Sequence, residues 1–127
     1  MGRRLALLVT CLVAAACVQS HGGALEIWVR SDATEPVLVR FTDWNGAVTQ
    51  PVIEAVPGAS VSAHRTSGPD IRIAVEVLDA SSCRVLSGLL LEGGGSVTVV
   101  IAPDLSVSRG AGGDPTSPPA RLVSKCQ

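Results

Sequence analysis

The chain has 127 residues, which is enough for one domain with a single two-layer core. Its net charge of −1 provides no basic surface of the kind that nucleic acid requires, so a nucleic-acid partner is not expected. With no tyrosine, one phenylalanine and two tryptophans, the chain also has few aromatic platforms on which bases or sugars could stack.

The first residues have the three parts of a secretory signal peptide. Arg3 and Arg4 form a short positive region, Leu5 to Val13 is apolar, and Ala14 to Ala16 supplies small residues before a cleavage point. The apolar stretch is shorter than the roughly 20 residues that a membrane-spanning helix needs. We therefore expect residues 1–16 to be a cleaved leader and the mature chain to be exported.

Two cleavage points are compatible with this leader. The segment Ala14-Ala15-Ala16-Cys17 resembles the lipobox of bacterial lipoproteins, although alanine stands where the first residue is usually leucine. The resemblance implies cleavage before Cys17, a lipid anchor on that cysteine and a tether over residues 17–24. The alternative is ordinary cleavage after Ser20, with Val18 and Ser20 as the small residues, which gives a soluble secreted or periplasmic protein.

The cysteine count supports a disulfide in the mature chain. Cys11 leaves with the leader, and either lipidation of Cys17 or cleavage after Ser20 leaves two thiols, those of Cys83 and Cys126. An even number of cysteines is expected in an oxidising compartment. We predict that Cys83 and Cys126 form a disulfide; the alternative is a buried free thiol at Cys83 and an unpaired Cys126.

From Leu25 onwards, apolar and polar residues alternate with a period of two, which is typical of β-strands with one buried face. The first two strands, separated by a turn-rich connector, are expected to form an antiparallel hairpin. Pro51 cannot donate a sheet hydrogen bond, so its strand is expected at an edge or with a bulge. The expected strands cover residues 25–30, 37–41, 48–56, 59–65, 71–78, 83–91, 97–101 and 105–108.

These seven or eight short strands, with turn residues every 8–12 positions and no helical stripe, predict a single all-β domain over residues 25–108. We expect a small antiparallel β-sandwich that is immunoglobulin-like in general architecture only, because the immunoglobulin spacing of Cys, Trp and Cys is missing. Residues 109–127 are rich in Gly, Pro and Ser and are expected to be a flexible tail. Its end is held back if Cys126 is bridged. The predicted core residues are Leu25, Ile27, Val29, Val37, Val39, Phe41, Ile71, Ile73, Val75, Val77, Val97, Val99 and Ile101.

No set of side chains matches a metal or cofactor site. The two mature histidines, His21 and His64, lie far apart in sequence and lack a paired ligand spacing. A blue-copper site on a β-sandwich usually needs an axial methionine, and the one methionine is Met1. We therefore expect no metal and no cofactor.

Four residues of the types used in catalytic triads lie close together in the sequence, namely Ser60, Ser62, His64 and Asp70. No strand-turn-helix pattern resembling a nucleophile elbow surrounds them. We expect Ser60, Ser62 and His64 to share the solvent face of their strand, so no catalytic residue is assigned. A small secreted hydrolase remains the alternative to a non-catalytic domain.

The two tryptophans are the candidate contact residues, because exposed tryptophan is enriched at binding hot spots. Trp28 alternates with the apolar residues of its strand, and Trp44 lies at a predicted turn. The alternative is that Trp28 packs in the core.

Together these observations predict an exported, lipid-anchored, non-catalytic β-sandwich that serves as a binding or structural module of the bacterial cell envelope. Its expected partners are the membrane, through Cys17, and an unidentified envelope or extracellular protein. Pairing of a partner strand with the Pro51-containing strand or with the tail is a further possibility.

Overall fold

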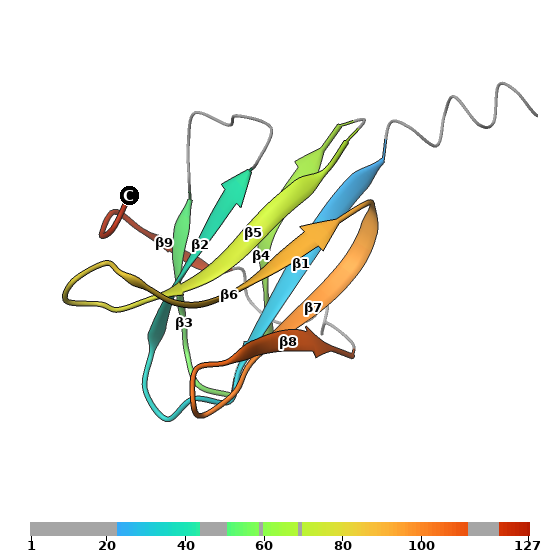
Figure 1. The fold of residues 1–127 in the computed structure, drawn as a ribbon. Coiled ribbons are helices and arrows are strands. Elements are labelled where there is room, and N and C mark those ends of the chain that lie inside the picture. The colour runs from blue at the N-terminus through green and yellow to red at the C-terminus, as the bar shows by residue number, and fades with distance from the viewer. Residues whose placement is uncertain (1–22, 44–50, 59, 69, 112–119) are drawn as a thin grey trace, which may run out of the picture.

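The computed structural model describes residues 23–43, 51–58, 60–68, 70–111 and 120–127. In these ranges the regular secondary structure consists of strands alone, arranged as two sheets packed face to face (Figure 1). The predicted all-β sandwich is confirmed. In the same ranges, no helix is long and apolar enough to cross a membrane.

Nine strands are present in the described ranges, where seven or eight were expected. One sheet has the order β4-β1-β7-β8 and is called sheet A; the other has the order β6-β5-β2-β3-β9 and is called sheet B. All pairings are antiparallel except that of β1 with β7, which is parallel. The strands are β1 (Ala24–Ser31), β2 (Val37–Asp43), β3 (Val52–Ala55), β4 (Ser60–Ser67), β5 (Arg72–Leu78), β6 (Val85–Glu92), β7 (Gly95–Ile101), β8 (Val107–Gly110) and β9 (Arg121–Val123).

The expected hairpin of the first two strands is wrong, because β1 belongs to sheet A and β2 to sheet B. The connector between them crosses from one sheet to the other. Asp32 N donates to Ile101 O at 2.8 Å, and Ala33, within the connector, is buried. A hairpin and a crossing between sheets both appear in the sequence as two alternating strands joined by a short polar connector, so periodicity did not separate them.

The core lies between the sheets and is made by the alternating apolar residues. Of the predicted core residues, Ile71 is 7% exposed, while Val37 and Val97 pack at the margin as partly buried side chains. Full burial of each large apolar side chain contributes about 1.5–3 kcal/mol, so this layer dominates the stability of the domain. The residues no more than 1% exposed in this core are Leu25, Ile27, Val29, Val39, Phe41, Ile53, Ile73, Val75, Val77, Leu91, Val99 and Ile101.

The Pro51 segment does not form a sheet edge, because β3 lies between β2 and β9. Pro51 precedes the first residue of β3, and its carbonyl accepts a hydrogen bond from Phe41 N at 3.0 Å. The proline therefore interrupts no pairing on either side. The strand that covers β3 is β9, which lies within the range predicted as a tail.

A second, smaller apolar cluster lies on the outer face of sheet B. Leu38, Val52 and Leu78 are 6%, 0% and 3% exposed, and Val123 and Cys126 pack against them. We call these five residues the outer cluster. The C-terminal segment supplies the side chains that cover this face of the sheet.

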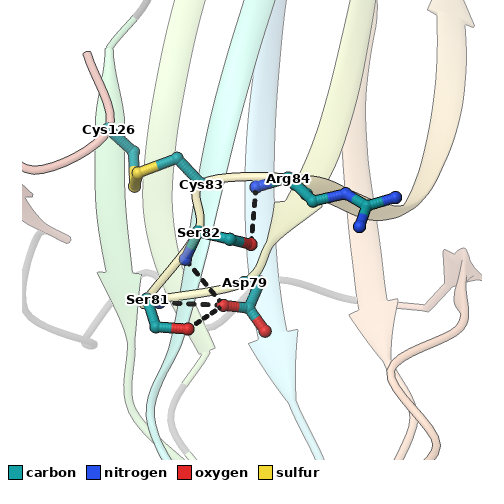
Figure 2. Close-up of a disulfide and its surroundings, with 6 residues drawn as sticks. All are labelled: Asp79, Ser81, Ser82, Cys83, Arg84 and Cys126. Carbon is teal, nitrogen blue, oxygen red and sulfur yellow. Dashed lines mark hydrogen bonds between the residues drawn. A yellow bond between two sulfur atoms is a disulfide. The ribbon is translucent and has the colours of Figure 1, made fainter.

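The predicted disulfide is confirmed, and it holds the C-terminal segment against sheet B (Figure 2). Cys83 follows β5, Cys126 follows β9, and their Cα atoms are 5.4 Å apart. The bridge joins positions 43 residues apart in the chain. It therefore holds the C-terminal segment against the sheet that this segment extends and covers.

Candidate functional site: a pocket between three loops

A pocket of about 270 Å³ opens at the end of the sandwich where the chain crosses from β1 to β2. Three connectors surround it: the β1–β2 crossing, the β5–β6 loop and the β7–β8 loop. Its large apolar lining residues are Val37, Leu38, Leu78, Leu86 and Leu105, and the polar residues Thr34, Glu35 and Asp79 also line it. Loops carried by a rigid sandwich are a common place for binding sites, so this pocket is the candidate functional site.

The β1–β2 crossing is fixed by Ser31, the last residue of β1. Ser31 is fully buried, and its Oγ accepts a hydrogen bond from Ala33 N at 3.2 Å. The backbone carbonyl of Ser31 also accepts a bond from Gly58 N at 2.8 Å. The exposed residues Thr34 and Glu35 extend from this fixed base to one side of the pocket.

The β5–β6 loop is organised around the carboxylate of Asp79 (Figure 2). One oxygen of this carboxylate, Oδ1, accepts bonds from Ser81 N at 2.8 Å, Ser81 Oγ at 2.6 Å and Ser82 N at 2.9 Å. Cys83 N donates to the Asp79 carbonyl at 2.8 Å. Local bonds of this kind fix a loop without help from the rest of the domain. The disulfide adds a covalent restraint at Cys83.

The β7–β8 loop repeats the same Asp-x-Ser arrangement. Asp104 Oδ1 accepts bonds from Ser106 N at 3.0 Å and Ser106 Oγ at 2.6 Å. Between them, Leu105 has a φ of 70°, in the left-handed region that a leucine seldom occupies. Ser87 Oγ donates to the Leu105 carbonyl, and Leu105 N donates to Ala102 O at 2.8 Å. These bonds hold Leu105 in the pocket wall despite an unfavourable backbone conformation.

All three loops are therefore fixed before anything binds. A pocket with restrained walls loses little conformational entropy when it is filled, which favours binding. Non-glycine residues with positive φ often lie at functional sites, and Leu105 is one of three in the described ranges, with Cys83 and Cys126.

The rim of the pocket carries negative charge. Hydrogen bonds from the Ser81 hydroxyl and from the Ser82 and Ser81 amides hold the pKa of Asp79 well below its usual value. The Ser106 hydroxyl and amide likewise lower the pKa of Asp104. Both carboxylates are thus ionised at neutral pH. Asp79 and the exposed Glu35 line the pocket, and Asp104 lies between two lining residues, Pro103 and Leu105. This charge favours a ligand with a basic group beside its apolar part.

Trp28 lies outside the pocket, on the outer face of sheet A. It is half-buried, and its Nε1 donates to Glu26 Oε1 at 2.8 Å. It pairs with Ser62 on one side and with Thr98 on the other. Because Trp28 is not between the sheets, the alternative that placed it in the core is wrong. Its role in contacts stays a prediction.

The serines and the histidine considered for a triad do not come together. Trp28 pairs with Ser62 but the preceding Ile27 pairs with His64, so Ala63 is an extra residue on β4. This bulge turns His64 toward the interior, and the expectation that Ser62 and His64 share the solvent face is wrong. A bulge of one residue reverses the alternation of faces beyond it, so an uninterrupted period of two assigned His64 to the wrong face.

His64 instead stacks on Phe41, with ring centroids 5.0 Å apart and an angle of 12° between the ring planes. Burial lowers the pKa of its imidazole below the usual value, and the negative charge of Asp43 opposes this shift. The neutral imidazole thus behaves as a packing residue at the margin of the core.

Two of the predicted site residues, Cys17 and Trp44, lie outside the described residues. Within the described ranges, no group of three or more His, Cys, Asp or Glu side chains is arranged to hold a metal ion. Neither Cys83 nor Cys126 lines the pocket, but their disulfide restrains the β5–β6 loop beside it.

The pocket residues were not identified from the sequence. The three loops are distant along the chain, and each one alone indicates a turn. The available signal was the repeated Asp-x-Ser, at Asp79 to Ser81 and at Asp104 to Ser106, because both segments favour a self-bonded loop. Comparisons with protein-family models, with curated proteins and with solved structures found no match.

Proposed function

We propose that the mature chain is an exported, lipid-anchored, non-catalytic module that binds a segment of another protein in the bacterial cell envelope. The binding site is the pocket between the three loops. The observation that carries the proposal is an open pocket with both apolar and polar lining residues, whose three surrounding loops are each fixed by local hydrogen bonds.

The size and chemistry of the pocket suggest what it binds. Its volume of about 270 Å³ is slightly below the range of about 300–1,000 Å³ typical of sites for whole small molecules. Such a space suits one large apolar side chain of a partner. A lysine or arginine next to that side chain is favoured by the lining acids Asp79 and Glu35, and by Asp104, which lies between two lining residues.

The proposed location rests on two features of the sequence and on one of the structure. The leader of residues 1–16 directs export, and the resemblance of Ala14 to Cys17 to a lipobox supports an anchor on Cys17. The Cys83–Cys126 disulfide is compatible with an oxidising compartment outside the cytoplasm. A short tether after Cys17 would keep the pocket near the membrane surface.

Binding is tested by placing a photo-crosslinking amino acid at Thr34, which lines the pocket and is exposed. The matched control position is Arg65, which is exposed on β4 and does not line the pocket. We expect a discrete adduct with a second protein in intact cells from position 34 and none from position 65.

The variant Leu105→Asn should abolish that adduct. Asparagine tolerates a positive φ better than leucine, so the loop keeps its shape while the apolar wall is lost. Equal adducts from both positions, or an adduct that Leu105→Asn leaves unchanged, would contradict binding in the pocket.

The anchor is tested separately, with Cys17→Ser. We expect the wild-type chain in the membrane fraction with an acylated N-terminal cysteine, and the variant in the soluble fraction or unprocessed. A wild-type N-terminus at unmodified His21, measured by mass spectrometry, would refute the lipid anchor and indicate ordinary secretion after cleavage at Ser20. The pocket proposal would not be affected.

A further inference from the structure

The pocket and the outer cluster share two side chains. Leu38 and Leu78 line the pocket, and both are also buried members of the outer cluster. In the outer cluster they are packed together with Val123 and Cys126, which belong to the C-terminal segment, residues 121–127. One wall of the pocket is therefore the margin of an apolar surface that continues over sheet B beneath this segment.

The C-terminal segment is attached to the domain at its two ends. At one end, β9 pairs with β3 over three residues. At the other end, the disulfide joins Cys126 to Cys83 in the loop that follows β5. The last residues of a chain fray unless they are tied down, and a three-residue strand is a weak attachment. The disulfide is therefore the bond that keeps the segment over Leu38 and Leu78.

The disulfide lies where a reductant can reach it. Cys83 and Cys126 are half-buried, and their neighbours Ser82, Arg84 and Lys125 are exposed. Both cysteines have positive φ values, 60° and 65°, in the left-handed region that residues other than glycine seldom occupy. Once the bridge is open, both backbones are free to leave this conformation, which favours reduction.

The reaction that opens the bridge is thiol–disulfide exchange with a protein dithiol. A thiolate of the dithiol attacks one sulfur of the bridge and forms a mixed disulfide, and the second thiol of the dithiol then displaces the protein's cysteine. The dithiol becomes a disulfide and gives up two electrons and two protons. Cys83 and Cys126 each become a free thiol.

The segment that covers the surface indicates what binds there in its place. Val123 packs in the outer cluster, and the exposed residues Arg121 and Lys125 lie two positions before and two positions after it. Arg121 is opposite Glu54 in the pairing of β9 with β3, and opposite charges in such positions attract. The surface thus accepts an apolar side chain flanked by basic residues, which is also the chemistry that suits the pocket.

We propose that the C-terminal segment is a redox-controlled cover of the binding site. Reduction of the disulfide releases residues 121–127, and the pocket then continues past Leu38 and Leu78 to Val52 as a longer apolar groove. The oxidised chain binds one apolar side chain of the partner, and the reduced chain binds a second one that takes the place of Val123. The partner segment therefore binds more tightly after reduction. The ligand in this inference rests on the proposed function, whereas the release of the cover does not.

Release of the cover is measured with Nile red, an uncharged dye that fluoresces on apolar surfaces, added to the mature chain carrying Cys17→Ser. We expect dithiothreitol to produce two free thiols per chain and to raise the dye fluorescence severalfold, with the sheet content retained by circular dichroism. The double variant Cys83→Ser, Cys126→Ser should show the raised fluorescence without a reductant.

A pair of variants identifies the surface that the dye reaches. Val52→Thr changes the outer cluster without touching the lining of the pocket, and it should remove most of the increase on reduction. The matched control Leu90→Thr changes an exposed leucine outside the outer cluster and should leave the increase unchanged. Two free thiols without a rise in fluorescence, a bridge that dithiothreitol does not reduce in the folded chain, or a rise that Val52→Thr leaves intact would each overturn the proposal.

The gain in binding is measured with the photo-crosslinking amino acid at Thr34. We expect more adduct per chain from the double cysteine variant than from the oxidised chain, and Val52→Thr in that variant should return the yield to the oxidised level. Equal yields from the oxidised chain and the double variant would overturn the gain in binding and leave the pocket's partner in place. A dye increase on reduction without any adduct in either form would refute the proposed partner and support the release of the cover.

Discussion

The two apolar layers of this domain are built in different ways. The core between the sheets is made of side chains from strands that pair with one another over most of their length. The outer cluster has a sheet on one side and a short C-terminal segment on the other, and a disulfide holds that segment. The same chemistry, burial of apolar side chains, thus depends on extensive strand pairing in the core. In the outer cluster it depends on the three-residue pairing of β9 with β3 and on one disulfide.

The sequence reflects this difference. Strands buried on one face alternate, whereas strands buried on both faces contain adjacent apolar residues. Val77 and Leu78 are adjacent and both buried, one in the core and the other in the outer cluster. The adjacent residues Val52 and Ile53 are divided in the same way. The adjacent apolar residues at Val52–Ile53 and at Val77–Leu78 thus mark the outer face that the C-terminal segment covers, whereas those of β6 do not, because Leu90 is 41% exposed.

The largest effect is expected in the core, from Phe41→Ala. Phe41 is 1% exposed and also stacks on His64, so its truncation creates a cavity that neighbours cannot fill. We expect a loss of about 3–5 kcal/mol in the free energy of unfolding, measured by urea denaturation. A loss below about 1 kcal/mol would contradict the claim that the core between the sheets dominates the stability of the domain.

Removal of the disulfide should have the next largest effect. For a loop of this length the chain-entropy model gives up to about 4 kcal/mol, and measured values are commonly about 2–4 kcal/mol. We expect a loss in that range for Cys83→Ser combined with Cys126→Ser, with sheet content retained by circular dichroism. Loss of all cooperative unfolding would show that the core between the sheets does not fold without the disulfide.

A smaller effect is expected from a matched pair of valines, which tests whether the outer cluster depends on the disulfide more than the core does. Val52 in the outer cluster and Val39 in the core are both 0% exposed. Val52→Ala should cost about 1–2 kcal/mol in the oxidised chain and clearly less once the two cysteines are replaced, because its cover is then loosened. Val39→Ala should cost the same in both backgrounds. If removal of the disulfide changed the cost of Val39→Ala as much as the cost of Val52→Ala, the two layers would not differ in their dependence on the disulfide.

The smallest effect concerns pH. Burial lowers the pKa of His64 in the folded chain, so the unfolded chain takes up its proton first as the pH falls. The neutral imidazole stabilises the fold at pH values above the pKa that His64 has in the unfolded chain. This stabilisation is lost as the pH falls from that value toward the lower pKa that His64 has in the folded chain. We expect stability to decline as the pH falls through about 6.5, the ordinary pKa of an imidazole, and His64→Gln to reduce that slope. If the variant shows the same change in the free energy of unfolding with pH, groups other than His64 cause the pH dependence.

The sequence predicted the fold class and most strands because alternation is a local property of the chain. It also predicted the Cys83–Cys126 bridge, because these are the two cysteines left when those of the expected leader and the expected lipid anchor are set aside. The sheet to which each strand belongs was not predictable, since the β1–β2 crossing resembles a hairpin. The strand β9 was missed because its three residues, Arg121 to Val123, carry too short a pattern.

The candidate site was harder to predict for a physical reason. Its wall residues, such as Leu86 and Leu105, come from loops and strand ends that meet only when the sandwich has formed. The bulge at Ala63 also reversed the direction of His64, which removed a group that the sequence had placed on the surface. Local patterns thus fixed which residues form strands, while the site depends on how distant connectors are brought together.

Amide hydrogen exchange with and without a reductant tests the difference between the two layers most directly. We predict that reduction of the Cys83–Cys126 bridge lowers protection in β9, in β3 and in the loop from Asp79 to Arg84, while β1 and β7 in sheet A keep theirs. Unchanged protection in β9 and β3 after complete reduction, or an equal loss across both sheets, would contradict the account.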